Sequence, residues 1–248
     1  MKNTAKLILQ KTLGYKNYLF IFSLFKIYTL KFKKSEQDLL FFINMLPKNG
    51  VVLDIGANIG ITSIPIAKHI TEGKVFSFEP MPFNAKVLHN VINYFNLKNT
   101  EVFEIALSNI SGSIKMVAPK EKGVKMQGLS HIYEENNNSE WNKGEIFTVP
   151  VHALDEVQVL KQISKITAIK IDVENHEYNV LMGGEQLLKK HRPIIYCELW
   201  QDEKRKQCIS FLESLNYSAK VYFNKTLIDY KDKPDELNLF FIPNLPEG

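Results

Sequence analysis

Two acidic residues stand at the ends of two short apolar segments in the first third of the sequence. Asp54 lies inside VVLDIGANIG (51–60), and Glu79 directly follows the apolar segment 75–78. Both segments have the composition of buried parallel strands, whose carboxyl ends form the ligand-binding edge of a sheet. A carboxylate there can accept hydrogen bonds from a ribose diol, and Pro80 stops the second strand. The pair therefore predicts a nucleoside site.

The turn after the first strand differs from the turn that binds a dinucleotide. Its pattern is D-x-G-x-N-x-G, whereas the dinucleotide fingerprint is G-x-G-x-x-G. An acid is a poor neighbour for a pyrophosphate and a good one for an ammonium group. S-adenosylmethionine carries an ammonium, a sulfonium and a ribose but no phosphate, so the residues favour it as the cofactor. The contacts predicted here are Asp54, Gly56, Ala57, Asn58, Gly60, Glu79 and Pro80.

Four motifs in this order resemble those of one enzyme family. They are DIGANIG (54–60), SFEPMPFN (77–84), IALSN (105–109) and KIDVENHEYNVLMGG (170–184). Together they look like the FkbM-type S-adenosylmethionine-dependent methyltransferases over about residues 51–199. The resemblance implies a class I methyltransferase (Rossmann-like) α/β fold and methyl transfer to a hydroxyl oxygen, often on a sugar, glycan or related metabolite. It also implies that Ala106, Leu107 and Ser108 lie at the adenine ring.

A second acidic cluster follows the predicted fourth strand. Its members are Asp172, Glu174, His176 and Glu177, with Glu198 at the end of the next strand. Three interpretations stay open. In the first, the carboxylates cap turns and a helix end. In the second, one of the carboxylates, or His176 in their place, is the base that takes a proton from an acceptor hydroxyl. In the third, Asp172 and Glu198 hold a divalent metal ion that acidifies the hydroxyl. Asp172 is also a predicted cofactor contact.

Two other functions compete with methyl transfer. A nicotinamide-dependent oxidoreductase shares the strand, the glycine turn, the helix and the ribose acid, but the missing G-x-G-x-x-G disfavours it. A non-catalytic scaffold with the same fold is favoured only by Asn175, which stands where the family usually has glycine. Asparagine tolerates left-handed backbone angles, so the turn can survive.

The charge distribution favours one catalytic domain with an N-terminal appendage. The chain has 248 residues and a net charge of +4, but residues 1–34 hold eight lysines and no acid, so the remainder carries −4. An acidic catalytic part argues against nucleic acid as a partner. We expect a helical arm over 1–46 and a methyltransferase domain over 47–248. Only two cysteines, Cys197 and Cys208, favour a reducing cytoplasm over a disulfide framework.

The N-terminal arm is rich in lysine and aromatic residues. Its densest apolar segment, YLFIFSLF (18–25), is far shorter than the ~20 residues that span a bilayer. We expect one or two helices that pack on the catalytic domain or on a second copy of the chain. The alternative is a cationic helix lying on an anionic membrane, which would place the protein peripherally at the inner membrane.

The remaining pattern predicts a mostly parallel seven-stranded sheet with an antiparallel C-terminal pair. The strands are expected at 51–55, 75–78, 101–107, 168–173, 193–199, 217–223 and 237–242. Helices are expected over 35–46, 61–70, 82–96, 176–189 and 202–215, the first of them capped at Ser35. After a hairpin arm at 111–117, the polar segment 118–147 is predicted to be an irregular lid or variable loop. Its His131 is interpreted as solvated, with a base as the less favoured role.

Overall fold

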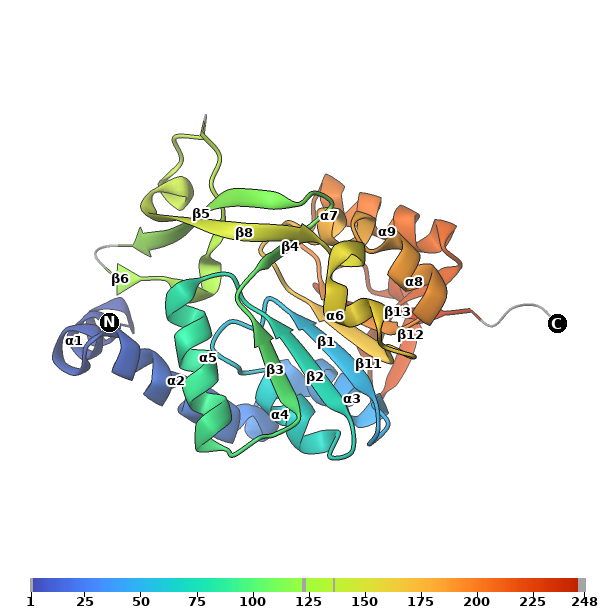
Figure 1. Cartoon of the computed structure of the whole chain (residues 1–248), viewed down its shortest axis with the longest axis horizontal. Helices are drawn as coiled ribbons and strands as arrows, with labels where there is room; N and C mark the ends of the chain where they lie inside the picture. The colour runs from blue at the N-terminus through green and yellow to red at the C-terminus, as the bar shows by residue number, and fades with distance from the viewer. Residues whose placement is uncertain (1, 122–123, 136, 245–248) are drawn as a thin grey trace.

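The computed structural model describes residues 2–121, 124–135 and 137–244. Its main sheet has the strand order β12-β11-β13-β10-β9-β1-β2-β3 (Figure 1). The strands are β1 (Val51–Ile55), β2 (Lys74–Phe78), β3 (Thr100–Phe103), β9 (Ala168–Ile171), β10 (Ile194–Glu198), β11 (Tyr217–Phe223), β12 (Thr226–Asp229) and β13 (Asn238–Pro243). The five strands from β3 to β10 are parallel, and β13 is antiparallel to both of its neighbours. The predicted α/β sheet with an antiparallel C-terminal pair is confirmed.

The predicted number of strands is corrected from seven to eight in the part that the structure describes. β12 pairs with β11 across a tight hairpin whose two turn residues, Asn224 and Lys225, have φ values of 48° and 65°. Positive φ at both positions is typical of the two-residue turns that match the twist of an antiparallel pair. Lysine is an uncommon residue in such a turn, which explains why the sequence pattern did not predict the additional strand.

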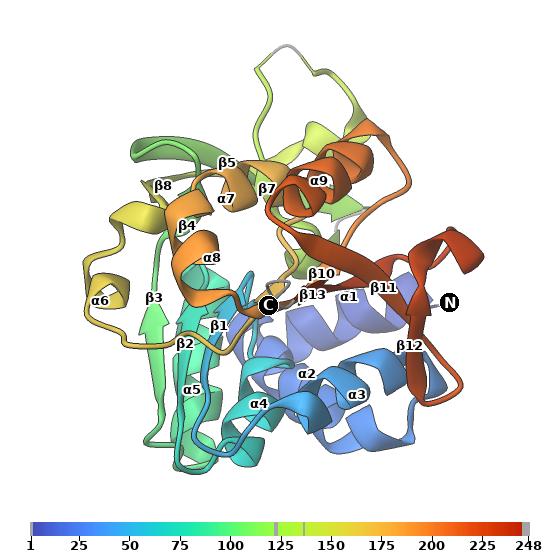
Figure 2. The same cartoon turned by 90° about the vertical axis from the view of Figure 1, so that its right-hand side faces the viewer.

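Helices cover both faces of the main sheet (Figure 2). They are α1 (Lys2–Leu13), α2 (Tyr15–Thr29), α3 (Gln37–Met45), α4 (Ser63–His69), α5 (Pro82–Tyr94), α6 (Gln158–Lys161), α7 (Glu177–Met182), α8 (Glu185–His191) and α9 (Glu203–Ser214). Alternate residues of a strand point to opposite faces, so Val52 packs with α3 and α4, whereas Leu53 and Ile55 pack with α7, α8 and α9. This double-sided burial explains the continuous apolar composition of β1.

A second, smaller sheet lies over the carboxyl edge of the main sheet (Figure 1). It contains β4 (Ala106–Ser108), β5 (Gly112–Glu121), β6 (Val124–Lys125), β7 (His131–Ile132) and β8 (Gly144–Ala153). The predicted hairpin arm at 111–117 is part of β5, which pairs with β8 as the two long strands of this sheet. The prediction of an irregular segment over 118–147 is therefore wrong at its ends, which belong to β5 and β8, and also in its interior, which contains β6 and β7.

The predicted third strand, 101–107, is divided between the two sheets. β3 pairs with β2 as far as Phe78 and Phe103, and the amide of Glu79 then donates to the carbonyl of Phe103 at 3.0 Å. Pro80 has no N–H, so the ladder cannot continue beyond it. The chain turns away and forms β4, which pairs with β8 in parallel.

The predicted helix over 176–189 is two helices, because the chain breaks between α7 and α8 at Gly183 and Gly184. A Cβ atom at Gly183 would lie 1.8 Å from the carbonyl oxygen of Ser108. The first of the predicted helices is also corrected: α3 begins at Gln37 after a 3-10 turn and has no side-chain cap from Ser35. Helix α9 begins as predicted, with Asp202 accepting from the amide of Arg205.

The N-terminal helices pack on the catalytic part of the chain, which was the first of the two expectations for the arm. Tyr18 and Leu19 of α2 are buried in a cluster with Val87 and Leu88 of α5. The hydroxyl of Ser23 donates to the carbonyl of Ile59 at 2.7 Å, next to the glycine turn. Among the described helices, none combines the length and apolar character needed to cross a bilayer. The boundary between arm and domain at residue 46 stays a prediction.

Helix α1 is tied to the second sheet. The side-chain amide of Gln10 donates to the carbonyl of Lys125 at 3.2 Å and accepts from its backbone N–H at 3.3 Å. The ammonium group of Lys125 lies over the rings of Tyr15 and Phe83 and forms an ion pair with Glu145 at 2.8 Å. The arm thus holds the end of the strand that leads into residues 126–130.

Candidate active site

The turn after β1 is shaped by a close approach of two backbones. Gly56 has a φ of 76°, and a Cβ atom there would lie 1.8 Å from the carbonyl oxygen of Asp172. Only glycine satisfies both conditions. The amides of Gly56 and Ala57 donate to the carbonyl of Phe78, each at 3.0 Å. The turn therefore brings the ends of β1, β2 and β9 together around one pocket.

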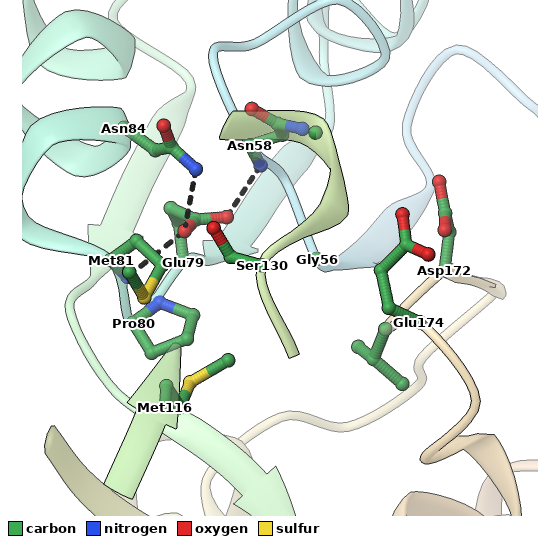
Figure 3. Close-up of a pocket in the computed structure, with 12 residues that line it drawn as sticks. Gly56, Asn58, Glu79, Pro80, Met81, Asn84, Met116, Ser130, Asp172 and Glu174 are labelled. Carbon is green, nitrogen blue, oxygen red and sulfur yellow. Dashed lines mark hydrogen bonds between the residues drawn. The ribbon is translucent and has the colours of Figure 1, made fainter. Parts of the chain in front are cut away.

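Glu79 forms one wall of that pocket (Figure 3). It is 4% exposed, and its carboxylate accepts from the backbone amides of Asn58 at 2.7 Å and Met81 at 2.9 Å. The side-chain amide of Asn84 donates to it at 3.3 Å. Burial raises the pKa of Glu79 to about 7 despite these donors. The predicted ribose acid is thus oriented by the turn that it faces.

Asp54 lies beneath the turn rather than on the pocket wall. It is fully buried, and its Oδ2 accepts from the hydroxyls of Thr62 and Ser63. Its Oδ1 lies 3.5 Å from the ammonium group of Lys170, which is also buried and donates to the carbonyl of Gly56 at 3.0 Å. The negative charge of Asp54 is therefore already paired, and its direct contact with a cofactor stays a prediction.

Lys170 is a functional residue that the sequence analysis did not identify. Its ammonium group lies between Asp54 and Asp172, 3.6 Å from the latter's Oδ2. Burial opposes its charge, but the carboxylates of Asp172 and Asp54 prevail and raise the pKa of Lys170. One lysine balances one of the two acids, so the three groups together keep a net negative charge, and Asp172 lies on the pocket wall. A lysine inside the apolar strand AIKIDV was the available signal.

Glu174 lies on the pocket wall opposite Glu79 (Figure 3). The backbone is left-handed at both Glu174 and Asn175, with φ values of 54° and 72°, so Asn175 adopts the angles expected for the family's glycine. Burial, reinforced by the nearby charges of Asp172 and Glu198, raises the pKa of Glu174 to about 8. Burial and Asp172 likewise raise the pKa of Glu198 to about 7. Near-neutral pKa values are those that a base needs at physiological pH.

The family follows from a match over most of the chain. The sequence model of the family described as "Methyltransferase FkbM domain" matches residues 54–221. The chain belongs to the FkbM methyltransferase family. Membership confirms the predicted family, the class I methyltransferase fold and S-adenosylmethionine as the cofactor, and it decides against the nicotinamide alternative.

Relatives of this FkbM-family chain act in different settings. It is 25% identical over 176 residues to methyltransferase sdnD of Sordaria araneosa, covering 62% of this chain and 68% of that protein. It is 25% identical over 178 residues to the hexuronic acid methyltransferase AglP of Haloferax volcanii, covering 71% and 67%. It is 29% identical over 180 residues to the antimetabolite synthetase AmbE of Pseudomonas aeruginosa, but spans only 8% of that protein.

A solved FkbM structure supports the fold. The crystal structure of methyltransferase FkbM from Methylobacillus flagellatus matches with a TM-score of 0.54 at 14% sequence identity. The match covers 97% of this chain and 59% of that one. At this identity the likeness supports the fold alone, so the acceptor must be argued from the site.

The predicted cofactor contacts of the FkbM chain divide into three groups. Gly56, Asn58, Glu79, Pro80 and Asp172 line the pocket. Ala106 and Leu107 line an adjoining apolar slot, and their contact with the adenine ring stays a prediction. The other predicted contacts, Asp54, Ala57, Gly60 and Ser108, are not among the lining residues of either hollow.

Two members of the predicted catalytic cluster have structural partners. Glu177 is buried, and its Oε1 accepts from the amides of Val173 at 3.0 Å and Asn175 at 3.2 Å, which fixes the left-handed turn. The Nε2 atom of His176 lies 2.9 Å from the hydroxyl of Ser108, and burial lowers the pKa of His176 to about 4. His176 is therefore neutral at physiological pH.

The predicted metal alternative finds no support in the part of the chain that the structure describes. There, no group of three or more histidine, cysteine or acidic side chains is arranged to hold a metal ion. The ammonium group of Lys170, 3.6 Å from Asp172, also opposes a second cation at that carboxylate.

The interpretation of His131 as solvated is wrong. His131 is buried at 7% exposure and stacks on Trp141, with ring centroids 4.6 Å apart. Together with Trp200 and Glu174 it lines a second cavity of about 200 Å³. The sequence analysis did not identify either tryptophan, because they are 59 residues apart and meet only in the fold.

Proposed function

We propose that this protein transfers the methyl group of S-adenosylmethionine to a hydroxyl oxygen of a sugar or a related small metabolite. The observation that carries the proposal is the position of Glu174, which lines both the cofactor pocket and the second cavity. A group at that boundary can reach an acceptor hydroxyl on one side and the methyl donor on the other. The similarity to a hexuronic acid methyltransferase supports a sugar acceptor.

The residues of the pocket suit a cationic, donor-rich cofactor. Glu79 and Asp172 present acceptor oxygens, and the side-chain oxygen of Asn58 is buried without a hydrogen-bond partner among the described residues. S-adenosylmethionine offers ribose hydroxyls, an ammonium group and an adenine amino group as donors. A buried acceptor without a donor costs free energy, so such a ligand would satisfy it. Glu79 would hold the ribose, and the net negative charge around Asp172 would attract the cation.

Glu174 is proposed as the general base. When bound, S-adenosylmethionine would supply an activated methyl group. The bond from that methyl carbon to sulfur would break as its bond to the acceptor oxygen forms, and the electrons of the broken bond would stay on the sulfur. The chain must align the acceptor and take the hydroxyl proton, and Glu174 receives it on its carboxylate. With a pKa of about 8, Glu174 gains its basic form as the pH rises. General bases of this kind contribute ~10²–10⁴ in rate.

The base assignment is tested by methyl transfer from labelled S-adenosylmethionine to a panel of methyl glycosides. We expect the rate to rise toward pH 8, and Glu174→Gln to lower kcat by ~10²–10⁴ and to remove that rise. The affinity for S-adenosylhomocysteine, measured by calorimetry, should stay within about twofold. Glu185→Gln, an exposed carboxylate paired with Lys189, is the matched control. Unchanged kcat in Glu174→Gln would reject Glu174 as the base.

The part of the second sheet around Met116, together with residues 126–130, is proposed as the cover of the cofactor pocket. Met116, Gly128 and Ser130 contribute to its wall, and the enclosed space is about 60 Å³. Ligand sites for molecules of this size usually measure at least ~300 Å³. Entry of the cofactor would therefore require this cover to move outward.

A second proposal concerns the arm, which we infer docks on an anionic membrane surface. Ile21, Phe25, Tyr28 and Phe32 follow one another at helical spacing along α2 and the 3-10 turn η1 (Leu30–Phe32), and all are exposed, Phe32 by 76%. Burial lowers the pKa of Lys26, and the nearby Lys33 and Lys6 lower it further. Among the described side chains, no lysine of residues 6–34 forms an ion pair.

Co-sedimentation with vesicles tests the arm without truncating it. Removing residues 1–34 would expose the buried cluster around Leu19, so substitutions at the exposed face are preferable. We expect binding to vesicles with anionic lipid, weaker binding with neutral lipid, and loss of binding in Phe25→Ser with Phe32→Ser. The control is Ile146→Ser with Phe223→Ser, which removes two exposed apolar side chains elsewhere. Equal sedimentation of both double variants would reject the membrane, and a dimer in light scattering would indicate self-association instead.

A further inference from the structure

A second cavity adjoins the cofactor pocket at Glu174. It encloses about 200 Å³, and the residues that matter for its chemistry are His131, Trp141, Glu174, His176, Trp200 and Lys204. They come from β7, from the 3-10 turn η4 (Glu140–Asn142), from the segment after β9, and from the loop and helix after β10. The cavity is therefore built from segments that belong to both sheets and to the helices beside them.

One wall of the cavity is aromatic. The ring of Trp141 stacks on His131 with an angle of 17° between the planes, and Trp200 meets Trp141 edge-on at 5.9 Å and 64°. Trp200 is 37% exposed, so its side chain is only partly covered by protein. Large aromatic faces bind apolar C–H surfaces while leaving their edges to polar groups.

The buried imidazole of His131 lacks one hydrogen bond. Its Nδ1 atom lies 2.9 Å from the carbonyl oxygen of Leu129, which can only accept, so Nδ1 carries the proton. Its Nε2 atom is buried and has no hydrogen-bond partner among the described residues. Burial lowers the pKa of His131, so the ring stays neutral and Nε2 keeps a free lone pair. A buried acceptor of this kind is satisfied by a ligand that donates a hydrogen bond.

The rest of the wall supplies polar groups of both kinds. Glu174 offers a carboxyl group, and the ammonium group of Lys204 donates to the carbonyl of Asn175 at 2.8 Å with two further donors to spare. An aromatic face beside a ring of donors and acceptors matches a pyranose, which has one C–H face and a rim of hydroxyls. A lipid or a polyaromatic ligand would leave these polar groups without partners.

We propose that this cavity is the acceptor subsite, that it takes one carbohydrate ring stacked on Trp200 and Trp141, and that Nε2 of His131 accepts a hydrogen bond from a hydroxyl of that ring. The proposal rests on the proposed function, because it assigns the acceptor side of the same site. His131 binds and orients the sugar, while Glu174 takes the proton of the reacting hydroxyl.

The two tryptophans make the cavity directly observable. They are the only tryptophans of the chain, and both line it, so the tryptophan fluorescence reports on this site alone. The full-length protein, saturated with S-adenosylhomocysteine, is titrated with methyl glucoside, methyl galactoside and methyl glucuronide, and with cyclohexanol as a ring that has one hydroxyl. We expect a saturable change with at least one glycoside and none with cyclohexanol over the same range. No change with any glycoside, or an equal change with cyclohexanol, would overturn the proposal.

Two substitutions at His131 separate the hydrogen bond from packing. His131→Phe keeps a ring to stack on Trp141 but removes the acceptor, and we expect it to weaken glycoside binding about tenfold. His131→Gln restores an acceptor oxygen near the place of Nε2, and we expect it to recover most of that loss. Equal binding by His131→Phe and wild type would show that Nε2 contacts no sugar.

Calorimetry with S-adenosylhomocysteine keeps the two proposals apart. If the wild type binds S-adenosylhomocysteine but no glycoside changes its fluorescence, the acceptor proposal fails while the cofactor site stands. If S-adenosylhomocysteine itself does not bind, the proposed function fails. A Trp200→Leu variant that keeps its affinity for S-adenosylhomocysteine shows that any loss of glycoside binding does not come from unfolding.

Discussion

At the scale of single residues, the site depends on a buried charge that the sequence pattern conceals. Lys170 stands in the middle of the central strand and lies at similar distances from Asp54 and Asp172, 3.5 Å and 3.6 Å. Asp54 is fully buried beneath the turn, whereas Asp172, 118 positions further along the chain, lies on the pocket wall. No local pattern could show that one lysine would lie between these two carboxylates, because they meet only in the fold.

Lys170→Met should be strongly destabilising. It leaves the fully buried Asp54 without its cation, and breaking such a buried pair costs roughly 3–5 kcal/mol. Denaturant unfolding monitored by circular dichroism measures the loss. Lys189→Met, which breaks an exposed pair with Glu185, should change the free energy of unfolding by about 0.5 kcal/mol or less. Similar losses in the two variants would contradict the role assigned to Lys170.

The cofactor-free protein should lose stability as the pH rises from about 5 to 8. Burial raises the pKa values of Glu79 and Glu198 to about 7 and that of Glu174 to about 8, above the value of about 4.3 in an unfolded chain. In this window the folded state holds protons that the unfolded state has released, so the free energy of unfolding falls as pH rises. Urea unfolding at several pH values measures the slope. Glu174→Gln should flatten it, whereas Glu185→Gln should not.

At the scale of elements, sequence reasoning succeeded where the determinants are local. The first strand, the glycine turn and the second strand could be predicted because an apolar run, a glycine and a proline each act within a few residues. The division of the predicted third strand between two sheets could not be predicted. It depends on Pro80, which has no N–H to continue the hydrogen bonds to β3, a strand that begins about 20 residues further along the chain. The acceptor cavity also could not be predicted, because Trp141 and Trp200 meet only once two sheets are stacked.

The break between α7 and α8 is another long-range effect and yields a prediction. Gly183→Ala would place a Cβ atom 1.8 Å from the carbonyl oxygen of Ser108, so the backbone must shift. We expect a loss of roughly 1–3 kcal/mol in the free energy of unfolding. Gly128→Ala is the control, because a Cβ atom there would have only an ordinary contact at 3.6 Å with Asn58. Equal stability of the two variants would show that the α7–α8 junction is not tightly packed.

At the scale of the whole molecule, the cofactor pocket is closed by parts of the chain that are distant in sequence. Its walls come from the ends of β1, β2 and β9 and from the second sheet, so a bound ligand should stabilise all of them together. At 100 times its Kd, S-adenosylhomocysteine should add about 2.7 kcal/mol to the free energy of unfolding. Thermal unfolding with and without ligand measures this. NADH at the same concentration should give no shift, and an equal shift would contradict the assigned cofactor.

The reciprocal bonds between Gln10 and Lys125 connect the outermost helix to the strand beside the pocket cover. A surface that immobilises that helix would also restrain residues 126–130, whose outward movement we propose for entry of the methyl donor. We therefore expect turnover to be slower on a vesicle than in free solution, and Gln10→Ala to abolish that difference. The N-terminal arm would then lower the rate of methyl transfer when the enzyme is bound to a membrane.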